Sequence, residues 1–205
     1  MKRRSHIVVY AGHGVEQWKK HPPSVESARP SRCPRCGCAS RVVGEPLKVI
    51  GHGLRTRLQY GPQTPNGAPL VWSFELRRYK CKPCSAIIEV VPPSVEPRRL
   101  YSRQAIAWAL KLFGVDRVSA GGTAVLLQPW RRVGFTARST WVQLRRWCRA
   151  IGHGALFDFV QSAPQSWTHR QVAERAAMTV AAYAPIEMRQ SDLSAQVWAG
   201  ALHAP

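Results

Sequence analysis

Four of the six cysteines fall into two Cys-x2-Cys pairs, and this spacing constrains the fold more than any other feature of the sequence. The pairs lie in RCPRCG and YKCKPC, which together read Cys-x2-Cys-x44-Cys-x2-Cys. Each short turn can place two thiolates on one side of a tetrahedral metal ion, and two such turns complete the coordination of Zn²⁺. The pattern therefore predicts one structural Zn²⁺ held by Cys33, Cys36, Cys81 and Cys84.

The two remaining cysteines, Cys38 and Cys148, are not needed as ligands. Cys38 follows the glycine of the first turn, where we expect its side chain to point away from the metal, and four ligands already close a tetrahedral site. Replacement of one ligand by Cys38 is the less favoured alternative. Cys148 lies on the apolar face of a predicted helix and is expected to be a core thiol. Four sulfur ligands also leave no open position for metal catalysis.

The segment between the cysteine pairs is typical of β-strands. LRTRLQY (54–60) and WSFELRRYK (72–80) alternate apolar and polar residues, and the Gly-, Pro- and Asn-containing segment 61–69 between them predicts a turn. SAIIEVVPP (85–93) predicts a third strand that ends at two prolines. The predicted fold class is α+β, with an N-terminal four-cysteine zinc ribbon (a small antiparallel sheet) followed by a helical, helix-turn-helix-like domain.

Helical periodicity begins after EPRRL. Ser102 is expected to cap a helix that extends to Phe113, and Ser139 or Thr140 one that ends at Gly152. Further helices are predicted at 124–128, at 168–183, which opens with the capping-box sequence THRQ, and at 192–201.

The domain organisation follows from these changes in pattern. Residues 1–28 are interpreted as a leader and linker, because HPPSVESARP is rich in proline and serine. The zinc ribbon is predicted at 29–97, the helix-turn-helix-like domain at 98–157 and a C-terminal helical tail at 158–205. For the tail, packing on the helical domain and self-association or binding of a partner protein are both open.

The balance of charge is the clearest indication of a partner. The 205 residues contain 30 Lys and Arg against 11 Asp and Glu, a net charge of +19. The excess is confined to residues 1–157, which carry a net +20, whereas 158–205 carry a net −1. A basic surface of this size indicates a polyanionic partner, and we expect nucleic acid.

The predicted helix at 139–151 is the main candidate for DNA contact. Its apolar residues share one side, and Arg145, Arg146 and Arg149 lie on the other. Such a helix can enter a major groove, where arginine pairs with guanine or phosphate; a merely solvated face is the alternative. Other arginines expected to contact nucleic acid are Arg55, Arg57, Arg98, Arg99, Arg103, Arg131, Arg132 and Arg138. For GHGLRTR (51–57), a phosphate-contacting ribbon and an ordinary turn remain equal alternatives.

Several of these pieces together resemble a family of bacterial zinc-ribbon proteins related to the N-terminal domains of insertion-sequence transposases. The matching segments are CPRCG (33–37), GHGLRTR (51–57), RRYKCKPC (77–84) and VPPSVEPRRLYSRQAI (91–106). The resemblance implies DNA binding connected with mobile elements, with zinc on Cys33, Cys36, Cys81 and Cys84. Few acidic residues lie beyond the ribbon, so we expect no metal-dependent catalytic core. An accessory or regulatory factor is the implied role.

The sequence bears on three classes of function. Double-stranded DNA is the expected partner, and an RNA-binding or ribosome- or polymerase-associated zinc-ribbon protein is the alternative. RNA recognition favours exposed aromatic residues, whereas most tryptophans here fall on apolar faces. No nucleophile–base arrangement indicates an enzyme. No segment approaches the roughly 20 apolar residues of a membrane span, so we expect no membrane partner and a cytoplasmic, nucleoid-associated protein.

Overall fold

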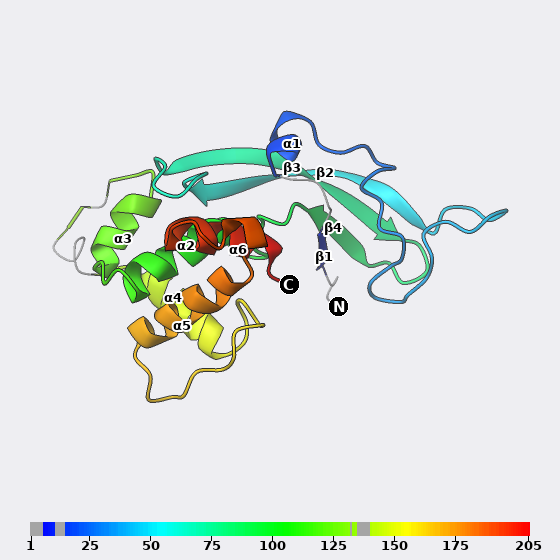
Figure 1. Ribbon diagram of the computed structural model, residues 1–205. Coiled ribbons are helices and arrows are strands. Elements are labelled where there is room, and N and C mark those ends of the chain that lie inside the picture. Colours follow the sequence, from blue (N-terminus) through cyan, green and yellow to red (C-terminus); the bar gives the residue numbers. More distant parts are fainter. Residues whose placement is uncertain (1–5, 11–14, 132, 135–139) are drawn as a thin grey trace. The chain divides into compact units, whose positions relative to one another are not determined.

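The protein has a mixed α+β fold that divides into two compact units. The structure, a computed structural model, describes residues 6–10, 15–131, 133–134 and 140–205. The first unit combines Met1–Leu58 with Trp72–Arg98, and the second combines Gln59–Val71 with Arg99–Pro205. In chain order the elements are β1 (His6–Tyr10), α1 (Val15–Lys20), β2 (Val49–Gly61), β3 (Leu70–Cys81), β4 (Ile87–Val91), α2 (Arg103–Gly114), α3 (Ala120–Leu127), α4 (Val142–Gly152), α5 (His169–Ala182), the 3₁₀ helix η1 (Ile186–Met188) and α6 (Leu193–His203) (Figure 1).

A four-stranded sheet with the order β1-β4-β3-β2 holds the first unit together. The inner strand β4 is buried along its whole length, which explains why its sequence, IIEVV, is almost continuously apolar. It pairs antiparallel with β3, where Tyr79 lies opposite Ile88, and parallel with β1, where Ile7 lies opposite Ile88. Because residues 62–69 are too few for a parallel crossover, β2 and β3 form a hairpin. The sheet is therefore mixed, and the predicted antiparallel sheet is only part of it.

The described segments before the first cysteine, 6–10 and 15–32, belong to this unit, in contrast to the predicted leader and linker at 1–28. Strand β1 extends the sheet, and Trp18 of α1 is 1% exposed in the same core as Phe74 and Leu76. Further along, the Tyr79 hydroxyl donates a hydrogen bond of 2.8 Å to the Val25 carbonyl. The apolar residues of β1 find a partner because β4 offers an unpaired edge on the side away from β3.

The second unit is built around α2. Ser102 caps this helix as predicted, its side chain accepting a hydrogen bond from the Ala105 N–H, and all residues from Arg103 to Leu110 are buried. Helices α5 and α6 pack against α2 and against each other (Figure 1). The segment 158–205 thus shares one core with 99–157 and is not a separate tail, because the consecutive apolar residues 105–110 of α2 face every side of the helix and need cover on several sides.

The other helix boundaries follow the sequence with two differences. The capping box at Thr168 and Gln171 is present at the start of α5. Helix α3 begins earlier than predicted, since Ser119 caps it by accepting from the Gly122 N–H. Helix α4 begins after Trp141, which makes no side-chain cap hydrogen bond; Ser139 lies outside the described residues. Along the described ranges, none of the helices has both the length and the apolar character needed to cross a membrane.

The contact between α5 and α6 depends on Gly200. A Cβ atom at this position would lie 2.0 Å from the Val180 carbonyl oxygen, which is backbone and cannot rotate away. We predict that Gly200→Ala lowers the free energy of unfolding of the helical unit by about 2–3 kcal/mol, because the helices must separate. Gly152→Ala is the matched control, since nothing lies within 4 Å of a Cβ there. Chemical denaturation of both variants checks this; equal stabilities would contradict the close packing.

Candidate metal centre and basic surfaces

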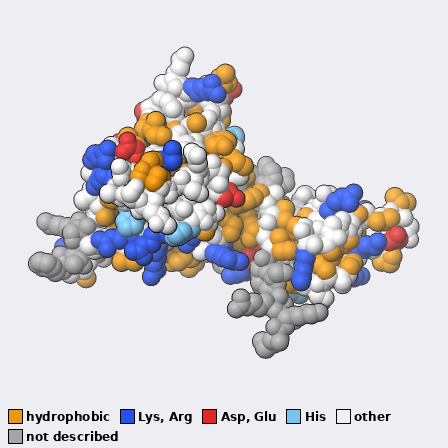
Figure 2. Space-filling model, turned by 90° about the horizontal axis from the view of Figure 1, so that it is seen from below, with side chains coloured by type: hydrophobic (Ala, Val, Ile, Leu, Met, Phe, Trp, Pro, Cys, Tyr) orange, Lys and Arg blue, Asp and Glu red, His pale blue; other side chains and the backbone are white. Residues whose placement is uncertain are grey.

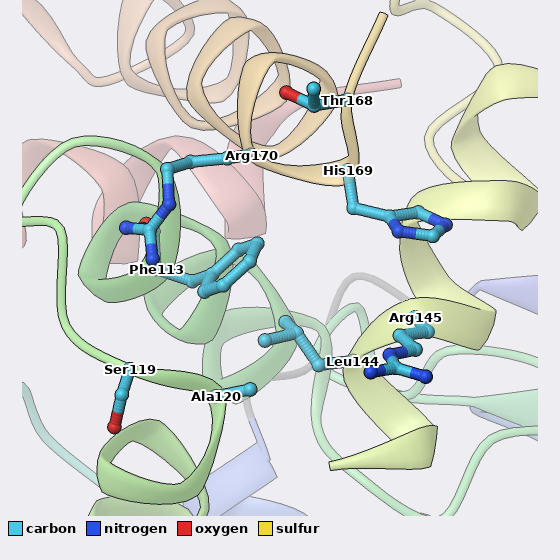
Figure 3. A pocket seen from close by; sticks show the side chains of 8 residues that line it. All are labelled: Phe113, Ser119, Ala120, Leu144, Arg145, Thr168, His169 and Arg170. Atoms are coloured by element: carbon cyan, nitrogen blue, oxygen red, sulfur yellow. The ribbon is translucent and has the colours of Figure 1, made fainter. Parts of the chain in front are cut away.

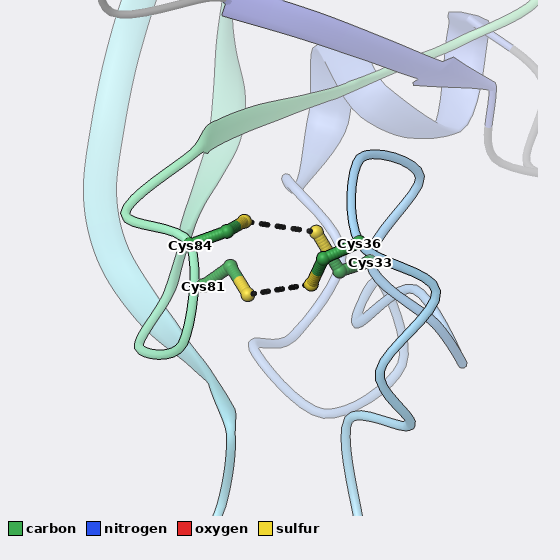
Figure 4. A group of neighbouring side chains, drawn as sticks. All are labelled: Cys33, Cys36, Cys81 and Cys84. Atoms are coloured by element: carbon green, nitrogen blue, oxygen red, sulfur yellow. Dashed lines mark hydrogen bonds between the residues drawn. The ribbon is translucent and has the colours of Figure 1, made fainter.

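The four cysteines predicted as ligands come together in the first unit (Figure 4). Their sulfur atoms all lie within 4.8 Å of one another. The Cys33 and Cys84 sulfurs are 3.7 Å apart, and so are those of Cys36 and Cys81. A regular tetrahedron with metal–sulfur bonds of about 2.3 Å has sulfurs roughly 3.8 Å apart. The four thiols are therefore close enough to hold one metal ion, and their spacing fits tetrahedral coordination.

The two Cys-x2-Cys turns have the same backbone structure. In the first, the Gly37 N–H donates to the Cys33 carbonyl at 2.8 Å, and the Cys33 N–H donates to the Cys38 carbonyl at 2.9 Å. The second turn repeats both bonds: Ser85 N–H to Cys81 carbonyl at 2.8 Å, and Cys81 N–H to Ala86 carbonyl at 3.0 Å. Gly37 and Ser85 both have positive φ, at 70° and 56°. Two turns that are distant in the chain thus form two equivalent halves of one site.

This equivalence explains the position of Cys38. It occupies the place that Ala86 occupies in the second turn, so it is not one of the paired ligand positions. Its sulfur nevertheless lies 3.6 Å from the sulfur of Cys81, so the Cys38 side chain is directed toward the site. The expectation that its side chain points away from the site is therefore not met. Cys148, by contrast, is buried in the helical core as expected.

The electrostatics of the thiols differ between the two turns. The backbone N–H of Cys38 lowers the pKa of Cys36 to about 6, because it donates to the thiolate. Desolvation raises the pKa of Cys81 and of Cys84 to about 12. These two thiols hold their protons at neutral pH, so a metal ion must displace the protons when it binds. Metal affinity therefore falls as the pH falls.

A second group of functional candidates lies on α4. Leu144, Trp147, Cys148 and Ile151 are buried, which confirms the predicted apolar face of this helix. Arg145, Arg146 and Arg149 are exposed, and no ion pair with a carboxylate is found for any of them in the part of the chain that the structure describes. Figure 2 shows Lys and Arg side chains gathered beside histidines on one face of the molecule.

The other arginines expected to contact nucleic acid differ in how far the protein itself engages them. Arg55 is 53% exposed but pairs at 2.6 Å with Glu89, a carboxylate buried on β4. Arg57 is half-buried and donates to the Glu96 carbonyl at 2.8 Å. Arg98 and Arg131 are exposed and Arg99 is partly buried. The predicted contacts at Arg132 and Arg138 lie outside the described residues.

The structure corrects the expectation for Arg103. It was expected to contact a phosphate from the connector before α2, yet it is only 6% exposed. Its guanidinium donates to the carbonyls of Ala204 and Pro205 and lies over the rings of Phe157 and Phe159. Because the first turn of α2 is buried beneath the C-terminal residues, Arg103 holds the helical unit together and is not available to a partner.

The sequence did not indicate a cavity of about 380 Å³ between α3, α4 and α5, or the part that His169 and Arg170 play in it (Figure 3). Only the helix caps could have pointed to this cavity from the sequence. Ser119 and Thr168 are residue types that commonly cap helices, and both line the cavity. Comparison with protein-family models, curated proteins and solved structures finds no match for this chain. Function therefore has to be inferred from these sites themselves.

The metal centre can be tested by exchanging one ligand for serine. We predict that Cys81→Ser lowers the bound metal from one ion per chain to near zero and unfolds the first unit, because metal binding and folding are coupled in such sites. Cys38→Ser is the matched control and keeps one ion, since Cys38 is not in a ligand position. Metal content by mass spectrometry and circular dichroism measure both effects. Retention of one ion by Cys81→Ser would disprove the ligand set.

Proposed function

We propose that the chain is a DNA-binding protein whose metal centre holds Zn²⁺ in a purely structural role. The observation that carries this proposal is the exposed face of α4, where Arg145, Arg146 and Arg149 lie opposite a buried apolar face. A helix anchored on one side with guanidinium groups on the other suits the major groove of duplex DNA. Arginine can pair there with guanine or with phosphate in a bidentate manner.

The donor set of the metal centre supports zinc in a structural role. Four thiolates at tetrahedral spacing match the soft, closed coordination that Zn²⁺ adopts in zinc ribbons. Cys33 and Cys81 are buried in the core of the first unit, so the ion would stabilise the fold there. Four protein ligands leave no position for a catalytic water, and the protein is proposed to act by binding, without chemistry at the metal.

The helix order α2, α3, α4 is the basis for proposing a helix-turn-helix-like arrangement with α4 as the helix that reads DNA. The connection from α3 to α4 runs through residues 128–141, whereas the turn of such motifs usually has about three or four residues. The role of α4 is therefore proposed from its charge and anchoring and not from the length of that turn.

The resemblance to zinc-ribbon proteins related to transposases adds a biological setting to the proposal. An accessory or regulatory factor of a mobile element would need DNA binding and no catalytic carboxylates of its own. The metal centre and the basic helix are the parts of this chain that such a factor would use, and the proposed location is the cytoplasm, at the nucleoid.

An RNA-binding role is the second candidate, and one observation favours it. Trp130 is 45% exposed and stands beside the exposed Arg131, an arrangement that can stack on an unpaired base. Its ring also packs edge-on against Tyr60, which holds it in place. Against this, Trp108, Trp141 and Trp147 are buried in the helical core, so stacking positions are few among the described residues.

The choice between the two nucleic acids can be measured directly. We predict that labelled duplex DNA binds more tightly than single-stranded RNA of equal length, and that its affinity falls as the salt concentration rises, because phosphate contacts release counterions. Anisotropy titrations with both ligands at two salt concentrations check this. Tighter binding of the RNA would favour the second candidate, and no binding of either would contradict both.

The contribution of α4 can be separated from that of net charge. We predict that Arg145→Ala/Arg149→Ala weakens duplex binding at least tenfold and reduces the salt slope by about one unit for each phosphate that the helix no longer neutralises. Lys20→Ala/Arg189→Ala removes the same number of exposed positive charges elsewhere, for which no ion pair is found among the described residues, and should retain most of the affinity. If both double variants weaken binding equally, the binding is a general effect of charge and α4 does not face DNA.

A further inference from the structure

The cavity in the helical unit has an unusual lining for its position beside the basic helix (Figure 3). Its volume of about 380 Å³ is on the order of ten water volumes. Among the described residues, two arginines and a histidine line it, and no Asp or Glu does. The described lining residues are Phe113, Ser119, Ala120, Leu144, Arg145, Thr168, His169 and Arg170.

The basic side chains reach the cavity from two helices, α4 and α5. Arg145 comes from α4, and the imidazole of His169, at the start of α5, extends to the same side (Figure 3). Arg170 lies on the other side, where it donates to the Phe113 carbonyl at 2.6 Å and stacks over the Phe113 ring at 4.3 Å. Arg170 is thus fixed by the protein, while Arg145 has no carboxylate partner among the described residues.

Backbone N–H groups, which carry a partial positive charge, would also face an anion bound at this cavity's helix N-termini. Residues 119–120 begin α3 and residues 168–170 begin α5, so the first turns of two helices line one cavity. Ser119 and Thr168 each accept the N–H of the residue three positions on. The N–H groups of Ala120 and His169 have no acceptor within their helices. Both helix dipoles make the cavity more positive.

Burial and the positive potential act on His169 in the same direction. Desolvation, followed by the charges of Arg149 and Arg145, lowers its pKa below the ordinary value for histidine. No carboxylate from the residues lining the cavity offsets these charges; on its own helix the neighbouring charge is Arg170. An anion in the cavity would reverse the effect and stabilise the imidazolium.

We propose that this cavity binds a single phosphate group. A tetrahedral oxyanion can accept hydrogen bonds from several directions at once, which suits a cavity bordered by a guanidinium, an imidazole and the first turns of two helices. The source of this phosphate group rests on the proposed function. If the chain binds duplex DNA through α4, the group is one phosphate of the DNA backbone, next to the groove that α4 enters. The cavity would then fix the register of α4 on the duplex, as phosphate contacts commonly do.

The first test uses inorganic phosphate and needs no DNA. The pKa of His169 is followed by nuclear magnetic resonance with phosphate and with sodium chloride at the same ionic strength. Phosphate should raise the pKa of His169 and leave the imidazole resonances of the exposed His153, which does not line the cavity, unchanged. An unchanged pKa of His169 overturns the phosphate site, whatever the outcome of the DNA titrations.

Two variants of α4 then locate the site. Arg145→Gln should weaken the response to inorganic phosphate at least tenfold, whereas Arg146→Gln, on the same helix but outside the cavity lining, should retain it. A second pair tests the cavity without altering α4: His169→Gln should weaken the response to phosphate, and His153→Gln should retain it. Because the imidazole signal is lost in these variants, the response is measured from the phosphate-induced shifts of backbone amides. Unchanged melting temperatures show that the variants fold. An equally weakened response in Arg145→Gln and Arg146→Gln would overturn the assignment to the cavity.

The source of the phosphate is decided by adding duplex DNA. Under the proposal, saturating duplex raises the pKa of His169 and competes with inorganic phosphate. If inorganic phosphate binds in the cavity but bound duplex leaves His169 unchanged, the phosphate site stands and its assignment to the DNA backbone is overturned. If duplex does not bind at all, the function proposed above fails while the response to inorganic phosphate still tests the cavity.

Discussion

The mutual proximity of four cysteine sulfurs is the constraint on which the first unit depends. Cys81 is the last residue of β3, and the turn that it opens leads directly to β4 at Ile87. A metal ion on these sulfurs would therefore fix the connection between the two inner strands. The same turn is tied to the start of β2, because the Lys82 N–H donates to the Lys48 carbonyl at 2.8 Å. Four deprotonated sulfurs this close would repel one another, so a cation is needed before Cys81 and Cys84 lose their protons.

The positive charge of the chain divides into two kinds with different consequences. Some arginines serve the fold: Arg103 holds the C-terminal residues, and Arg55 neutralises the buried Glu89. Others, of which Arg145 is one, project from α4 with no carboxylate partner among the described residues. Only arginines without such a role in the fold can bind a polyanion at little cost in stability. A net charge of +19 therefore overstates the surface available for binding.

Local patterns accounted for much of the architecture. Ser102 and Thr168 were recognised as caps because capping depends on residues only three positions apart. The faces of α4 followed from the helical period alone. The parallel pairing of β1 with β4 was not foreseen, because it depends on a sheet edge formed by residues about 80 positions away. Burial of Arg103 was missed for the same reason: its cover comes from Ala204 and Pro205.

The sequence alone predicts which four cysteines come together, since the spacing within each Cys-x2-Cys turn already places two sulfurs side by side. It also determined which side of α4 is charged. The tertiary structure alone decided that residues 158–205 belong to the helical core and that Cys38 lies close to Cys81. It also brought His169 and Arg145 to one cavity. The physical reason is that turns and helices are specified by neighbours in the chain, whereas a cavity is specified by the packing of elements that are distant in sequence.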